Sequence, residues 1–111
     1  MHRLQSDEIW HFYKGSPISI VELLPENGGF RETLLGPDLL QYTVIANTWF
    51  GSYPVGSNAS SESEAPPYSF VGCTVSPGFE FEDFELASRS KLTVEFPNAA
   101  KIIEKLTVGL S

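Results

Sequence analysis

The chain has 111 residues, of which 41% are hydrophobic and 13% aromatic, which is enough for one domain with a buried core and excludes a disordered chain. Its formal charge of -7 repels phosphate backbones, so we expect no nucleic-acid partner. No apolar run approaches the roughly 20 residues that span a bilayer, and no signal peptide is recognisable. The single cysteine, Cys73, cannot form an internal disulfide. We therefore expect a cytoplasmic or otherwise intracellular protein without a membrane partner.

The first half of the chain predicts β-structure. Residues 8–14 alternate two faces and are rich in aromatic side chains, and residues 17–24 continue as a second strand, so 8–24 is predicted to form a β-hairpin. A turn cluster follows at 25–29. Residues 31–40 are ambiguous between the helical and the strand pattern.

The pattern of short strands continues to residue 75. Residues 41–46 alternate again, residues 47–54 predict a bent strand broken at Gly51, and 68–75 predict another strand. Residues 54–67 are rich in Ser, Pro and Glu and are interpreted as a loop within one domain.

The C-terminal part has helical spacing instead. We expect a helical tail over 88–111, with Ser88 as the first N-cap and Asn98, after Pro97, as the cap of a final short helix. Together these elements predict a single domain over 1–111, with an all-β barrel or sandwich over 1–87.

Three blocks, "HRLQSDEIWHFYKG", "QYTVIANTWFGSYP" and "FVGCTVSPGFEFEDFELA", occur in this order. Over roughly residues 2–90 the chain resembles the uncharacterised cupin-5 family, a branch of the cupin superfamily similar to dTDP-4-dehydrorhamnose 3,5-epimerase. The resemblance implies a cupin-type β-jelly-roll, or double-stranded β-helix. Members of that family usually carry further N-terminal strands, so this chain resembles a shortened version with an exposed sheet edge. An edge of this kind invites pairing, and we expect a homodimer.

The general cupin metal pattern is only partly present in the first block. His2 falls on its first histidine, whereas its second histidine is replaced by Leu4. Glu8 and Gly15 keep the glutamate and glycine with six residues between them.

The second block of the metal pattern is missing. Its proline, glycine and histidine fall on Ile45, Asn47 and Phe50, so the last ligand becomes an apolar ring. His2 and Glu8 supply two donors where cupin metals need several. We therefore expect no metal and no other cofactor.

Two residues are candidates for proton transfer. In the epimerase-like interpretation His2 occupies the place of a base, and neutral imidazole suits removal of a proton next to a carbonyl. Burial of Glu8 among aromatic rings would raise its pKa and make it an acid or base. The alternatives are a frayed His2 next to the first residue and a Glu8 that is hydrogen-bonded to the backbone or to Gln41.

Ligand contacts are expected from residues that share the barrel interior. Glu8, Trp10 and Phe12 alternate on one face of their strand, and Gln41 and Thr43 could orient a polar ligand from the next strand. The alternatives are core packing for the rings and solvent exposure or cross-strand pairing for the polar pair. The predicted ligand-binding set is Glu8, Trp10, Phe12, Gln41, Thr43 and Phe50.

Two further reactive side chains are interpreted as structural. His11 should point to the face opposite Glu8 and serve packing. Cys73 lies in a predicted interior strand without an obvious histidine partner, which favours a structural thiol over a nucleophile.

The favoured hypothesis is a metal-independent cupin that binds a small polar or sugar-like molecule in its barrel. The first alternative is a sugar epimerase or isomerase that uses His2 or Glu8. The second is a metal-dependent cupin oxygenase, which Leu4 and Phe50 argue against. One fold hosts many functions, so the fold does not choose between them.

Overall fold

The computed structural model of the protein describes residues 1–56, 68–76, 78 and 84–107. These residues form eight β-strands, a 3-10 helix and two α-helices. The strands are β1 (His2–Leu4), β2 (Asp7–Gly15), β3 (Ile18–Leu24), β4 (Gly29–Leu35), β5 (Gln41–Val44), β6 (Phe50–Pro54), β7 (Ser69–Ser76) and β8 (Phe84–Leu86). The helices are α1 (Arg89–Glu95), η2 (Pro97–Ala99) and α2 (Ala100–Leu106).

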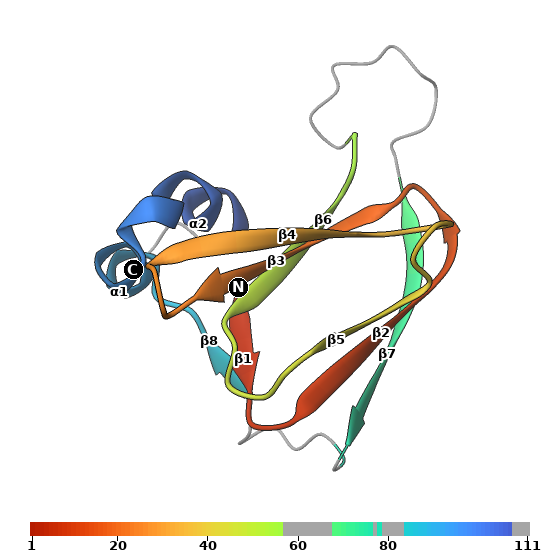
Figure 1. Cartoon of the computed structure of the whole chain (residues 1–111), viewed down its shortest axis with the longest axis horizontal. Coiled ribbons are helices and arrows are strands. Elements are labelled where there is room, and N and C mark those ends of the chain that lie inside the picture. The colour runs from red at the N-terminus through yellow and green to blue at the C-terminus, as the bar shows by residue number, and fades with distance from the viewer. Residues whose placement is uncertain (57–67, 77, 79–83, 108–111) are drawn as a thin grey trace.

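The strands form two antiparallel sheets that face each other (Figure 1). The larger sheet has the order β4-β3-β6-β1-β8 and the smaller one has the order β5-β2-β7. Strands β3 and β4 form a hairpin, and the ambiguous segment 31–40 supplies most of β4 and a turn closed by a bridge between Gly36 and Leu39.

The predicted hairpin over 8–24 is wrong. Its two strands lie in different sheets, because β2 pairs with β5 and β7 whereas β3 pairs with β4 and β6. The chain changes sheets after Gly15, whose φ of 100° is accessible to glycine but strained for other residues. Partners distant in the sequence therefore determine the pairing, and the short turn does not.

Gly51 does not break its strand but lies inside β6. A Cβ at this position would lie 3.2 Å from Met1 Cγ and 3.3 Å from Leu106 Cδ1. The missing side chain thus lets α2 approach the sheet closely. The predicted break at Gly51 is wrong, and close packing explains the glycine.

Two apolar cores separate the layers. One lies between the sheets and contains Trp10, Ile18, Ile20, Leu35, Val44 and Phe50. The other lies between the larger sheet and the helices and contains Leu23, Trp49, Leu92, Phe96, Ala99 and Ile103. Strand β3 contributes to both, because alternate side chains point to opposite faces.

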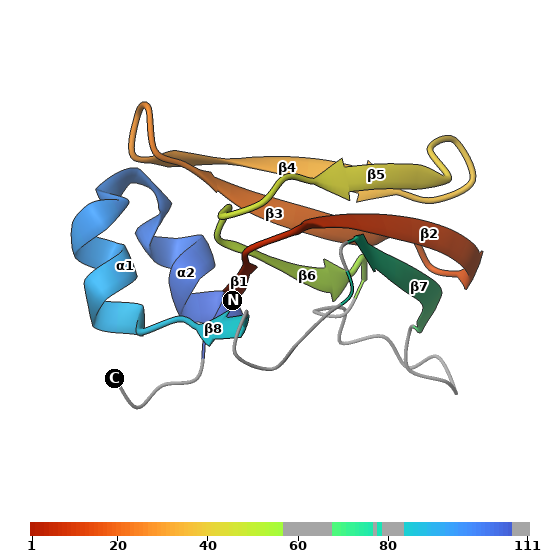
Figure 2. The ribbon, with the colours of Figure 1, turned by 90° about the horizontal axis from the view of Figure 1, so that it is seen from below.

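The helices lie at one end of the molecule, beside β1, β8 and the turn between β3 and β4 (Figure 2). Ser88 caps α1 as predicted, since its side chain accepts a hydrogen bond from Lys91 N at 3.5 Å. Asn98 does not cap α2, because the N-cap is Ala99 and the Asn98 side chain instead donates to Asn27 O at 3.2 Å.

Among the described residues, no helix is long and apolar enough to cross a bilayer.

Candidate functional site

The candidate site starts from the inner face of β2, which points at the larger sheet. Glu8 and Trp10 are 9% and 8% exposed, and Phe12 packs against the core between the sheets. The predicted alternation of this strand is confirmed, because all three side chains share the inner face. A carboxyl group thereby lies in an apolar and aromatic environment.

Two buried polar atoms on this face make no hydrogen bond of normal geometry, although the Trp10 indole and the Cys73 thiol lie near enough to the Glu8 carboxyl to interact with it. The two atoms are Glu8 Oε2 and Trp10 Nε1. Burial raises the pKa of Glu8, and the nearby Trp10 indole and Cys73 thiol offset this rise only in part. The expected rise of the Glu8 pKa is therefore confirmed in direction and cause. The alternative, a hydrogen bond from Gln41 to Glu8, does not occur among the described residues, where the Gln41 amide instead lies beside His11.

Cys73 lies directly opposite Trp10 in the pairing of β2 with β7. Its strand was predicted to be interior, but β7 is a terminal strand of the smaller sheet and Cys73 is exposed. Desolvation together with the Glu8 carboxyl raises the pKa of the thiol to about 12. At neutral pH the sulfur is therefore protonated, so it can donate a weak hydrogen bond but is a poor nucleophile.

Gln41 and Thr43 lie on the other face of the smaller sheet. The register places Gln41 opposite His11 and Thr43 opposite Ile9, and opposed residues in a sheet share a face. Gln41 Nε2 lies 3.3 Å from His11 Nδ1, and His11 Nε2 lies 3.0 Å from Thr74 Oγ1. The prediction that Gln41 and Thr43 join Glu8 in one site is therefore wrong in its geometry.

His2 is an ordered member of β1 and is not frayed. It pairs with Phe50 on β6 and with Leu86 on β8, and its ring lies 4.4 Å from the Phe50 ring and 5.2 Å from the Phe84 ring. Burial, helped by the charge of the N-terminus, lowers the pKa of His2, so the imidazole is neutral near pH 7.

Phe50 lies between His2 and the Trp10 ring, which neighbours Glu8. It is 1% exposed, and its ring contacts His2 on one side and meets the Trp10 ring edge-on at 6.2 Å on the other. No hydrogen bond or ion pair joins His2 to Glu8 within the described ranges. The structure thus brings His2, Phe50 and Trp10 into one aromatic series, in which Phe50 is a core residue.

The residues at the positions of the cupin metal ligands do not fit a metal centre. Leu4 and Phe50, which replace two of the pattern's histidines, are 5% and 1% exposed and offer no donor atom. No group of three or more His, Cys, Asp or Glu residues that could hold a metal ion occurs in the described part of the chain.

A second interior carboxylate was not predicted. Glu22 on β3 is 2% exposed, and the Tyr42 hydroxyl from the facing sheet donates a short hydrogen bond to its Oε1. Arg31 Nε lies 3.5 Å from the same oxygen. The signal was present in the sequence, because Glu22 continues the inward series of Ile18 and Ile20, and Tyr42 alternates with the apolar Val44.

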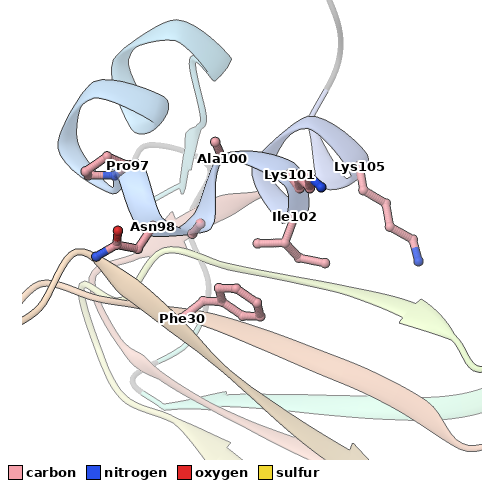
Figure 3. A pocket seen from close by; sticks show the side chains of 8 residues that line it. Phe30, Pro97, Asn98, Ala100, Lys101, Ile102 and Lys105 are labelled. Carbon is pink, nitrogen blue, oxygen red and sulfur yellow. The ribbon is translucent and has the colours of Figure 1, made fainter.

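Two hollows occur elsewhere on the described surface. The first, of about 570 Å³, lies between Phe30 on β4 and Ile102 on α2, with Lys101 and Lys105 at its rim (Figure 3). The second, of about 230 Å³, lies beside the 2.6 Å ion pair of Arg3 with Glu85. Neither contains a residue from the predicted site set, and neither presents a buried polar atom without a partner.

Chemically, the Glu8 region is a donor-rich patch in an apolar wall. The Trp10 indole N–H can only donate, the Cys73 thiol is a weak donor and a weak acceptor, and Glu8 gains a donor hydrogen when protonated. A buried donor without a partner costs free energy, which a ligand or water with acceptor atoms would recover.

Comparison with known proteins agrees with this geometry. Residues 1–87 match the model of a family described as Cupin superfamily (DUF985). A crystal structure of a protein from Shewanella oneidensis superposes with a TM-score of 0.80 at 35% identity over 96% of this chain and 65% of that one. A hypothetical protein from Leishmania major gives 0.80 at 32% identity over 96% and 66%. The chain thus spans about two thirds of each, and no curated protein matches it.

Two facing antiparallel sheets with this strand order, followed by a helical tail, define a β-jelly-roll of the cupin class. Within that class, the chain belongs to the cupin-5 family, the cupin superfamily branch described as DUF985.

Proposed function

We propose that the protein binds a small, polar, uncharged molecule, such as a sugar or a related hydroxy-carbonyl compound, against the inner face of β2, without a metal. The observation that carries this proposal is the pair of buried atoms without a hydrogen bond of normal geometry, Glu8 Oε2 and Trp10 Nε1. Hydroxyl and carbonyl oxygens would satisfy these groups, and the surrounding rings would cover the apolar side of a sugar. An intracellular location accords with the free thiol of Cys73.

The two tryptophans make a direct test possible. Trp10 lies on the proposed site, whereas Trp49 lies in the core beneath the helices. In ¹⁵N-labelled protein, millimolar neutral monosaccharides and small hydroxy-ketones should shift the indole N–H resonance of Trp10 and leave that of Trp49 in place. Saturating probes that move neither resonance, or both equally, would contradict the proposal.

Matched variants separate the inner face from the outer one. Glu8→Leu and Trp10→Phe remove a polar group from the site, and each should weaken binding of a responding probe by about ten-fold, the loss of roughly one hydrogen bond of about 1.4 kcal/mol. Thr43→Val removes a hydroxyl from the opposite face of the neighbouring strand and should leave affinity unchanged. Equal losses in all three variants would point to a general change in the fold.

Metal independence is tested by elemental analysis. Protein purified without chelator or metal resin should contain well below one equivalent of Fe, Mn, Ni or Zn per chain, because the described residues hold too few converging donors. About one equivalent, lost together with ligand binding in the His2→Ala variant, would contradict this part of the proposal.

A sugar-type epimerase or isomerase is the second candidate. It is favoured by the opposite pKa shifts of the two residues: burial lowers the pKa of His2, which keeps its imidazole in the neutral form of a base, and raises the pKa of Glu8, which favours the protonated form of an acid. An enzyme of this kind would exchange the hydrogen next to a substrate carbonyl with solvent. Deuterium incorporation from D₂O into a bound keto sugar that is lost in the Glu8→Gln variant would support the enzyme. Binding of the sugar without any exchange would contradict the enzyme and leave only the binding function.

A further inference from the structure

The larger of the two hollows lies on the helical side of the larger sheet, away from the inner face of β2. Phe30 of β4 is paired with Leu23, which belongs to the core beneath the helices, so the Phe30 ring points to that side. Ile102 of α2 lies over the ring, and Ala99 and Ala100 contribute only small side chains to the lining (Figure 3). The volume of about 570 Å³ is in the range of pockets that hold small organic molecules. The hollow therefore suits a small molecule with an apolar body.

Hydrogen bonds and burial fix the walls of this hollow. Asn98 N donates to Gly28 O at 3.2 Å, and Asn98 Nδ2 donates to Asn27 O at 3.2 Å, so η2 is tied to the turn between β3 and β4. Ala99 and Ile103 are 1% and 0% exposed and anchor the start and the middle of α2 in the core beneath the helices. The hollow is therefore pre-formed, and a ligand can enter without rearranging the helices.

Two lysines, Lys101 and Lys105, lie at the rim of the hollow, one turn apart on α2. They are two of the seven basic residues in a chain whose formal charge is -7. Lys105 Nζ lies 3.6 Å from the centroid of the Tyr53 ring, a contact that positions the ammonium group but does not neutralise it. Like charges four residues apart repel each other on a helix. An anion bound between the two ammonium groups would remove this repulsion.

The acidic residues near the two lysines do not supply that anion. Glu32 Oε2 accepts hydrogen bonds from Ser19 Oγ at 2.7 Å and from the Tyr53 hydroxyl at 2.8 Å. Neither Lys101 nor Lys105 forms an ion pair with any residue that the structure describes. The lining of the hollow contains no acidic side chain from the described ranges, so its charge is positive only.

We infer that this hollow binds a small carboxylic acid with an apolar body, such as a medium-chain fatty acid or an arylalkanoic acid. The apolar body would cover Phe30 and Ile102, where removal of apolar surface from water is favourable. The carboxylate would lie at the rim between Lys101 and Lys105. A neutral apolar molecule would leave the two ammonium groups without a partner, and inorganic phosphate would leave the apolar base uncovered. This site shares no residue with the proposed sugar site, so each can fail without the other.

The test uses octanoate as the probe and NMR spectroscopy of ¹⁵N-labelled protein to locate its binding. Octanoate at millimolar concentration should shift the amide resonances of α2 and β4 in a saturable way and leave the Trp10 indole resonance in place. Acetate and octan-1-ol each lack one half of the ligand and should bind at least about five-fold more weakly. Added salt should weaken the binding of octanoate but not that of octan-1-ol.

Several outcomes of this titration would overturn the inference. They are the absence of a saturable shift, equal affinity for octanoate and either control compound, and shifts spread over both sheets. Shifts of the α2 and β4 amides that follow protein concentration without any probe would also overturn it, because a second copy of the chain would then cover the hollow.

Variants separate the charge of the rim from the shape of the hollow. Lys101→Gln combined with Lys105→Gln should weaken octanoate binding by about five-fold or more and leave octan-1-ol binding unchanged. Ala100→Leu places a larger side chain in the hollow and should abolish the binding of both compounds. Lys14→Gln, on β2 in the smaller sheet, is the matched control and should not alter octanoate affinity. Equal weakening by Lys14→Gln, or wild-type affinity in either the double variant or Ala100→Leu, would contradict the assignment to this hollow.

Discussion

The Glu8 side chain places a carboxyl group in an apolar and aromatic environment. Burial raises its pKa in the folded protein above the ordinary value near 4.3. The protonated form is therefore favoured on folding, and its contribution to stability is complete below the unfolded pKa. That contribution is lost as the pH rises through the folded pKa.

We expect Glu8→Gln to change the pH dependence of stability. The variant should gain free energy of unfolding relative to wild type as the pH rises from 4 to 8, because the amide has no proton to lose. Denaturant titrations at several pH values measure this difference. Glu26→Gln, in the exposed turn after β3, is the control and should track wild type. A constant difference between Glu8→Gln and wild type over this range would refute the expectation.

The second prediction concerns the hydrogen bond that joins the two sheets. Tyr42→Phe removes the hydroxyl that donates to Glu22 and leaves its buried carboxylate oxygen with only the Arg31 guanidinium, 3.5 Å away, as a partner. An acceptor left without its partner should cost about 1–3 kcal/mol of unfolding free energy. Tyr68→Phe removes an exposed hydroxyl and should stay within about 0.5 kcal/mol of wild type. A Tyr42→Phe variant as stable as Tyr68→Phe would show that Glu22 finds another donor.

Single residues also show how far the sequence predicted the site. The alternation of β2 correctly placed Glu8 with Trp10 and Phe12, because period-two patterns assign faces within one strand. It failed between strands, where Gln41 and Thr43 were assigned to the interior for their polar chemistry. The pairing of Trp10 with Tyr42 instead turns Tyr42 and Val44 inward. The apolar members of that strand were the better guide, since burial of apolar surface determines the face.

At the scale of elements, the connection between β2 and β3 determines which strand enters which sheet. Gly15 has a φ of 100°, and a Cβ there would come closer to the carbonyl oxygen of Tyr68 than real side chains allow. The backbone at this point also receives a hydrogen bond, from Ser69 Oγ to Ser16 O at 2.6 Å. The change of sheet thus depends on a residue without a side chain.

Gly15→Ala should therefore destabilise the fold by more than about 1 kcal/mol, because the added methyl group brings both backbone strain and a steric clash. Gly78→Ala is the matched control, since nothing lies within 4 Å of a Cβ built there, and it should change stability by less than about 0.5 kcal/mol. Thermal or urea unfolding of the two variants provides the comparison. Equal stability of the two variants would mean that the connection can relax.

At the scale of the whole molecule, two tryptophans report on two cores. Trp10 belongs to the core between the sheets, and Trp49 belongs to the core beneath the helices, where the Arg3 guanidinium also lies 4.4 Å from its ring. Strand β3 is shared by both cores, so the barrel portion over 1–87 and the helical tail should unfold together.

Single-tryptophan variants test this cooperativity. In Trp10→Phe and in Trp49→Phe, the fluorescence midpoint in urea should equal the far-UV circular dichroism midpoint of the same variant, as expected for a two-state domain. A Trp49 signal that changes at clearly lower urea than the circular dichroism would show that the helices detach first, and the single-domain prediction would then be wrong.

The sequence by itself determined the local features of this protein. Alternation revealed β2, β3, β5 and β7, Ser88 marked the start of the first helix, and the three blocks in order indicated the cupin-5 family, because these signals lie within short stretches of chain. Tertiary structure alone decided which strands pair, which face of β5 is interior, and that Glu22 meets Tyr42. These features depend on contacts between residues far apart in the chain, where burial and register, rather than local propensity, determine the lowest free energy.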